Sequence, residues 1–82
     1  MSAAILAKRL LADAAGLDEA AIPEDARVGS FEQWESLVHM RLLLAVEEHL
    51  GRELDPDEVA GIESLAEIEA LLQTTPLGKG GS

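Results

Sequence analysis

Ser36, His39 and Glu35 are the residues whose types and spacing could support chemistry in this chain. Ser36 opens a stretch, residues 36–50, that contains neither glycine nor proline, so we expect a helix with this serine in its first turn. A serine oxygen there can accept a hydrogen bond from a free backbone N–H. The same place also suits an attached phosphate, because free N–H groups and the helix dipole favour negative charge. Two interpretations of Ser36 therefore stay open: an unmodified helix cap or a modified residue.

His39 follows Ser36 by three residues, which raises the question of a Ser–His hydrolase. Such an enzyme needs a strand–turn–helix elbow and glycines for an oxyanion hole, and the sequence around Ser36 offers neither. We therefore predict no catalysis by the chain, and a half-buried His39 near the base of anything attached to Ser36. Glu35 and His39 could share a metal ion, but two ligands do not complete a site, so we predict none.

The composition indicates one small acidic domain. The chain has 82 residues, sixteen Asp and Glu against six Lys and Arg, a net charge of −10 and no cysteine. Such a charge repels nucleic acid and anionic membranes and attracts basic protein surfaces. The apolar N-terminus is interrupted by Lys8, Arg9 and Asp13, so it is not a signal peptide. We expect a cytoplasmic monomer that binds neither nucleic acid nor membrane.

The elements that must position these residues are expected to be helices alone. Aromatic and β-branched residues are sparse and no segment alternates with period two, which indicates an all-α fold. Glycines, prolines and capping residues divide the chain into four helical segments. These are Ser2–Ala15 before Gly16, Ser36–Leu50 before Gly51, a short helix capped by Asp55 with Pro56 in its first turn, and a helix from Ser64 to about Gln73 with Glu67 completing a capping box.

A long connection, residues 17–35, separates the first two expected helices, and loops of this length are usually functional or disordered. We expect it to be pinned across the helices by three spaced apolar residues, Ile22, Val28 and Phe31. In the first helix, Leu6 and Leu10 form an inward stripe with Leu17. We assign residues 1–73 to one domain and residues 74–82 to a flexible tail.

The helix expected at residues 36–50 carries more apolar residues than one core-facing stripe requires. With about 100° of rotation per residue they fall on two sides of the helix. One side should face the core, together with two downstream residues: Leu42, Leu43, Val46, Leu50, Leu54 and Ile62. The other side, here called the apolar strip, consists of Leu37, Met40 and Leu44. A helix buried on two sides would show the same pattern, but three other helices offer too little surface for that. We therefore predict that the apolar strip is exposed and docks partners.

The ordered set of segments resembles the acyl carrier protein family. The matching pieces are Gly16-Leu17, "WESL" at residues 34–37, "AVEEHLGRELDPDEVAGIESLAEI" at residues 45–68, and the closing "EALL". Together they cover residues 3–72 with little or no gap. The "SL" pair alone is weak evidence, whereas the whole set at the family's spacing is strong.

The resemblance implies a four-helix bundle with a short third helix and a long loop between the first two. It implies that a phosphopantetheinyl transferase attaches 4′-phosphopantetheine from coenzyme A to Ser36. The arm would carry an acyl or aminoacyl group as a thioester between acyl-loading and acyl-processing enzymes, such as a ketosynthase, an acyltransferase or a ligase. Trp34 before the acidic residue indicates a specialised, polyketide-type pathway, and Glu35 departs from the Asp usual in the family.

The docking surface expected for these partners comprises Glu35, Leu37, Met40, Arg41, Leu44, Glu47 and Glu48. In it, the carboxylates steer basic enzymes and the apolar residues make contact. The alternative is a helical adaptor that uses the same surface, is never modified, and has Ser36 only as a helix cap.

Overall fold

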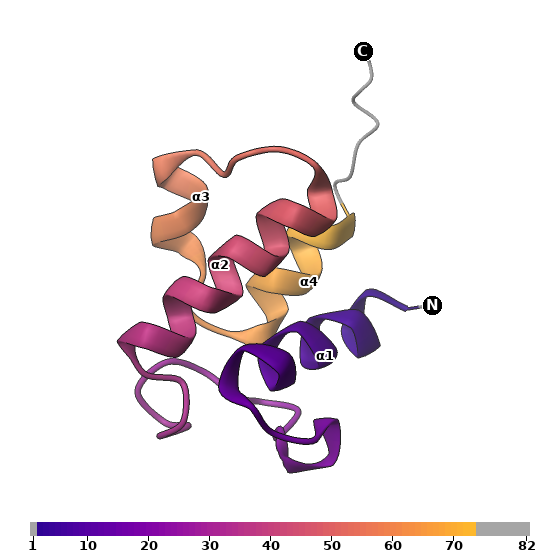
Figure 1. Cartoon of the computed structure of the whole chain (residues 1–82), viewed down its shortest axis with the longest axis vertical. Coiled ribbons are helices and arrows are strands. Elements are labelled where there is room, and N and C mark those ends of the chain that lie inside the picture. The colour runs from indigo at the N-terminus through magenta and orange to yellow at the C-terminus, as the bar shows by residue number, and fades with distance from the viewer. Residues whose placement is uncertain (1, 74–82) are drawn as a thin grey trace.

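The computed structural model describes residues 2–73, so the predicted tail at residues 74–82 lies outside the described residues. Within that range the chain has four α-helices and no strand, which confirms the all-α prediction. Figure 1 shows α2 crossing in front of α4, with α1 beside both and α3 set apart on one side. The elements are α1 (Ala3–Ala15), the 3-10 helix η1 (Glu19–Ala21), α2 (Ser36–Leu50), α3 (Pro56–Gly61) and α4 (Leu65–Gln73).

Local residues explain where the helices begin and end. The Ser2 hydroxyl accepts the N–H of Ile5 at 3.2 Å and so caps α1. Gly16 and Gly51 end α1 and α2 in the left-handed region, with φ of 72° and 74°, a conformation that costs glycine little. Before α4, the Ser64 hydroxyl donates a hydrogen bond of 2.7 Å to the carboxylate of Glu67. This bond lowers the pKa of Glu67 below its usual range. These boundaries agree with the prediction, whereas η1 was not predicted.

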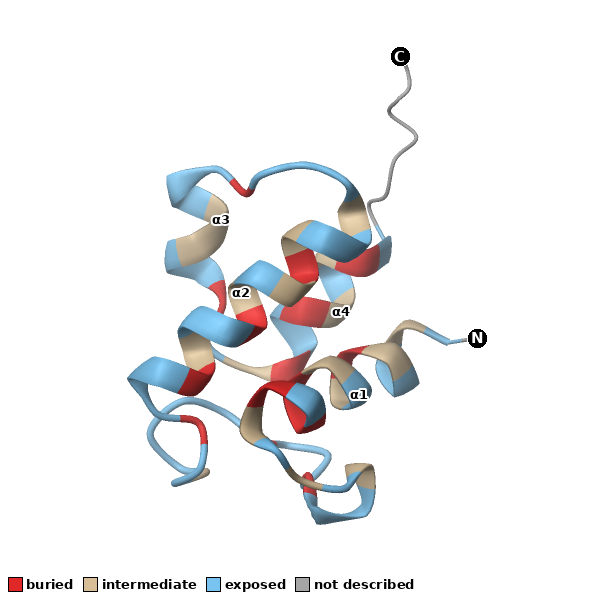
Figure 2. Cartoon of the chain, viewed as in Figure 1, coloured by how far each residue is buried: buried red, intermediate tan, exposed pale blue. Residues whose placement is uncertain are grey.

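The core lies where α1, α2 and α4 meet, since the close helix pairs are α1 with α4, α1 with α2, and α2 with α4. Figure 2 shows buried segments on the facing sides of these helices. The inward stripe predicted for α1 is confirmed only at the edge of the core: Leu6, Leu10 and Leu17 are half-buried and pack against it. The buried face of α1 is rotated from them and includes three alanines. Its buried residues are Ala7, Leu11, Ala12 and Ala14.

The core face of α2 is close to the prediction. Leu42 and Val46 are fully buried, and Leu54 and Ile62 downstream are buried as expected. The helix also buries Val38, which the prediction left out. The remaining two predicted residues, Leu43 and Leu50, are half-buried and pack against the edge of the core.

The connection between α1 and α2 is held mainly by backbone hydrogen bonds to the segment before α4. The N–H of Val28 donates to the Glu63 carbonyl at 2.8 Å, and the N–H of Leu65 donates to the Ala26 carbonyl at 3.2 Å. Val28 itself is 46% exposed, so its predicted role as an apolar pin is wrong. The backbone pairing turns the Val28 side chain outward, and it is Ile22, Ala26 and Trp34 that are buried.

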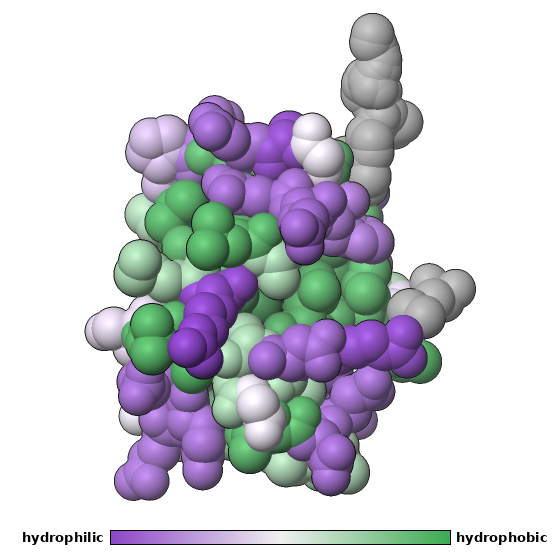
Figure 3. All heavy atoms as spheres, viewed as in Figure 1, coloured by the Kyte–Doolittle hydropathy of each residue, from purple (hydrophilic) through white to green (hydrophobic). Residues whose placement is uncertain are grey.

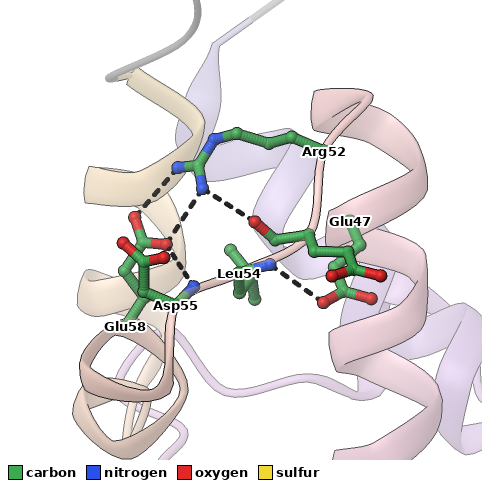
Figure 4. Close-up of polar contacts among 6 residues, drawn as sticks. Glu47, Arg52, Leu54, Asp55 and Glu58 are labelled. Atoms are coloured by element: carbon green, nitrogen blue, oxygen red, sulfur yellow. Dashed lines mark hydrogen bonds and ion pairs between the residues drawn. The ribbon is translucent and has the colours of Figure 1, made fainter.

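The short helix α3 buries none of its own residues and is held by polar contacts at its start (Figure 4). Arg52 donates two hydrogen bonds of 2.9 Å to the carboxylate of Glu58, which also accepts the N–H of Asp55 at 2.8 Å. Mainly through the Arg52 hydrogen bonds, the pKa of Glu58 falls to about 2. Glu47 on α2 accepts the N–H of Leu54 at 2.9 Å. These bonds fix the path from α2 into α3.

Candidate functional site

Ser36 is the first helical residue of α2, not its cap. The residue in the cap position is Glu35, whose extended backbone precedes the helix and whose carboxylate accepts the N–H of Leu37 at 3.2 Å. Of the two interpretations left open for Ser36, the structure does not show the helix cap, because α2 begins one residue earlier than a serine cap requires. The Ser36 side chain is exposed, and its hydroxyl has no hydrogen-bond partner within residues 2–73.

An open pocket of about 700 Å³ lies at this end of α2. Three parts of the chain form it: the end of the α1–α2 connection, the first turn of α2, and α3 with the residues after it. Ser36 is therefore placed at the border of a concave surface, which the sequence did not predict. The lining residues are Arg27, Val28, Trp34, Glu35, Ser36, His39, Val59, Ala60, Ile62 and Glu63.

His39 is held on the wall of this pocket by Trp34. The buried Trp34, 3% exposed, donates its indole N–H to Nδ1 of His39 at 2.9 Å, and the two ring centroids are 6.1 Å apart. Because an indole can only donate, Nδ1 must be the acceptor, and a neutral ring then carries its proton on Nε2. His39 is half-buried beside Ser36, as predicted. Its bond to Trp34 was not predicted.

The apolar strip is exposed, as the sequence predicted. Leu37, Met40 and Leu44 are 53%, 61% and 64% exposed. Figure 3 shows apolar surface over the region of α2, interrupted by charged side chains. An exposed apolar strip of this kind is typical of a surface that binds another protein.

The charged residues around the strip divide into two kinds. Arg41 and Glu48 are exposed, as is Glu35, although its carboxylate also caps α2. Glu47 is half-buried, and its carboxylate is occupied by the N–H of Leu54. The structure thus gives Glu47 a role in holding the α2–α3 connection, beyond the steering role predicted for it.

The residues that sequence reasoning missed come from other parts of the fold. Arg27 on the α1–α2 connection and Val59 and Ala60 on α3 line the pocket beside Ser36. No local pattern marks them, because they reach Ser36 only through the packing of segments distant in sequence. Among residues 2–73, no three His, Asp or Glu side chains gather closely enough to hold a metal ion.

The chain matches no protein-family model, no curated protein and no solved structure. Each helix within residues 2–73 is too short or too polar to cross a membrane.

Proposed function

We propose that the chain is an acyl carrier protein with 4′-phosphopantetheine on Ser36. The observation that supports this best is the Ser36 hydroxyl, which is exposed, free of hydrogen bonds within the described residues and placed on the border of an open pocket. Since Glu35 caps α2, the serine oxygen is not needed to hold the helix. It is free to be modified, and the helix N-terminus favours the negative charge that a phosphodiester brings.

In this proposal a transferase catalyses attack of Ser36 Oγ on the phosphorus of coenzyme A that bears the pantetheine. A new P–O bond forms to the serine, adenosine 3′,5′-bisphosphate leaves, and the hydroxyl proton passes to a base of the transferase. The chain has no cysteine, so the terminal thiol of the arm is its only thiol. That thiol holds an acyl or aminoacyl group as a thioester, and the chain itself catalyses nothing.

The surroundings of Ser36 suit a protein that passes its cargo between enzymes. The apolar strip begins at Leu37, directly after the attachment residue, so an enzyme docked on it has the arm within reach. The net charge of −10, with Glu35 and Glu48 exposed near the strip, favours basic partner surfaces. We assign the transferase, a ketosynthase, and an acyltransferase or ligase as partners of this surface.

The finer parts of the proposal follow from the family resemblance. The three packed helices with a short, separate α3 fit the bundle of acyl carrier proteins. The sequence Trp34-Glu35-Ser36 favours a specialised, polyketide-type pathway. A carrier that depends on coenzyme A and its thioesters would act in the cytoplasm, and we propose that location.

The test is intact mass spectrometry after incubation with coenzyme A and a broad-specificity phosphopantetheinyl transferase. We expect the parent chain to gain the mass of one phosphopantetheine and Ser36→Ala to gain none. Ser30→Ala is the matched control, because Ser30 is an exposed serine on the neighbouring loop, and it should be modified as well as the parent. If several transferases leave the parent unmodified, the carrier proposal fails and the unmodified adaptor takes its place.

A further inference from the structure

The Trp34–His39 pair places a fixed hydrogen-bond donor in the pocket. Nδ1 of His39 is occupied by the buried indole N–H at 2.9 Å, so the imidazole cannot rotate without leaving that donor unpaired. In the neutral ring the proton is on Nε2, at the opposite edge from Trp34. Within residues 2–73, nothing accepts a hydrogen bond from Nε2. A donor held in place without an acceptor is suited to a ligand.

The position of this donor relative to Ser36 follows from helix geometry. Ser36 and His39 are three residues apart in α2, so their side chains are neighbours on one face, with Cβ atoms about 5–6 Å apart. Both line the same pocket. A phosphodiester on Ser36 Oγ has two non-bridging oxygens that only accept hydrogen bonds, and they lie within reach of a donor at this distance.

The charges on the pocket wall do not attract a phosphodiester as a group. A specific hydrogen-bond donor is therefore needed to hold it there. Two carboxylates, Glu35 and Glu63, line the pocket and oppose an anion there. Arg27 is the cation on the lining, and within residues 2–73 its charge also acts on the carboxylate of Glu67, whose pKa it helps to lower. Arg27 lies next to Glu63, since Val28 pairs with Glu63 and Arg27 pairs with Ser64, so charge alone does not select a position for the phosphodiester, whereas the fixed donor of His39 can.

The rest of the pocket is suited to the arm beyond the phosphate. Val59, Ala60 and Ile62 give it an apolar wall on the side of α3. The pantetheine chain begins with a geminal dimethyl group directly after the phosphate, which such a wall can cover. An arm that leaves Ser36 past His39 meets this wall, whereas the neighbouring pocket at the start of α2 is lined by Glu32, Gln33 and Glu35 and offers less apolar surface.

We infer that His39, held by Trp34, is a positioning residue that donates Nε2–H to the phosphodiester on Ser36 and so directs the arm into the pocket beside α3. The inference rests on the proposed attachment of phosphopantetheine to Ser36. It assigns the hydrogen bond between Trp34 and His39 a role that does not follow from the family resemblance at residues 34–37.

The experiment is NMR spectroscopy of the chain labelled with ¹³C and ¹⁵N and modified from unlabelled coenzyme A. Isotope-filtered nuclear Overhauser spectra report contacts between arm and protein, and the ³¹P spectrum reports the surroundings of the phosphodiester. We expect contacts from the geminal methyl groups to the His39 ring and to Val59 and Ile62. An arm that shows no contact with the protein would overturn the inference.

Variants separate positioning from folding. In His39→Phe, which keeps a ring but no N–H, we expect the arm contacts to be lost and the ³¹P line to move to that of phosphopantetheinyl-serine in an unfolded peptide. His39→Gln restores an N–H donor and should recover part of both signals, and it replaces His39→Phe if that variant does not fold. Trp34→Phe, which frees the imidazole, should weaken the contacts. His49→Phe, an exposed position on the same helix, is the matched control and should change nothing.

Two failures are distinguishable. If intact mass shows no phosphopantetheine on the parent chain, the proposed function itself is wrong. If the parent and His39→Phe are both modified and keep the same arm contacts and the same ³¹P shift, the carrier proposal stands and the role of His39 is refuted.

Discussion

Exchanging Ser36 for alanine should leave the fold intact, whereas exchanging Glu35 for alanine should weaken it. The prediction follows from which residue caps α2. The Glu35 carboxylate accepts the N–H of Leu37 at 3.2 Å, and the Ser36 hydroxyl has no partner within the described residues. Removing an exposed hydroxyl that makes no hydrogen bond should change the free energy of unfolding very little.

The magnitudes can be worked from these contacts. Ser36→Ala loses no hydrogen bond and gains helix propensity, so we expect a change between zero and about 0.5 kcal/mol in favour of the fold. Glu35→Ala removes the cap, which costs about 0.5–1 kcal/mol, the lower part of the usual range because the bond is long. Glu35→Gln keeps an oxygen acceptor and should lose less.

Urea denaturation followed by far-UV circular dichroism, with the fluorescence of the buried Trp34 as a second probe, measures these differences. The reasoning is refuted if Ser36→Ala loses about 1 kcal/mol or more while Glu35→Ala is unchanged, since Ser36 would then be the cap. The expected result also makes Ser36→Ala a sound negative control for the modification experiment, because a loss of modification could not be assigned to unfolding.

Three further predictions concern the packing and polar contacts that hold the site. The pKa of Glu58 is about 2 against an ordinary 4.5, so the charged carboxylate is favoured in the folded state; its contribution is complete above pH 4.5 and is lost as the pH falls from 4.5 to 2. Arg52→Met should therefore destabilise the fold at neutral pH and flatten the acid limb of urea stability measured across pH. An acid limb unchanged by the substitution would contradict this. Leu42→Ala should lower the free energy of unfolding in urea by about 2–5 kcal/mol, and Leu44→Ala at an exposed position by less than about 0.5 kcal/mol. Equal losses in the two variants would show that Leu42 does not belong to the core. Glu47→Ala should lower the free energy of unfolding by about 1 kcal/mol and speed hydrogen exchange of the Leu54 amide. Glu48→Ala on the exposed side should do neither. Unchanged protection of the Leu54 amide in Glu47→Ala would show that the bond is not made in solution.

Much of the helical framework was readable from the sequence, because its signals are local. Gly16, Gly51 and Pro56 act on their own φ angles or on their missing N–H, and their effect does not depend on distant contacts. The exposure of the apolar strip was also predictable, since the helical period places Leu37, Met40 and Leu44 on a side that a chain of this size cannot cover.

Other features were decided only by packing. The buried face of α1 is centred on Ala7 and Leu11, whereas Leu6 and Leu10 pack at the edge of the core, because the rotation of α1 is set by its packing against α2 and α4. The outward turn of Val28 follows from backbone pairing with the segment before α4, which no local pattern reveals.

The candidate site shows the same division. Residue types and helical periodicity are enough to predict a serine in the first turn of an amphipathic helix, next to an acidic residue and an apolar strip. Three features became visible only in the folded chain. Glu35 caps α2, the indole of Trp34 holds the ring of His39, and α3 forms one wall of the pocket beside Ser36. Which residue caps a helix depends on the exact residue at which the helix begins, and sequence patterns do not fix this to within one residue. The pocket and the Trp34–His39 bond depend on the path of the α1–α2 connection, which is held by hydrogen bonds to residues far along the chain.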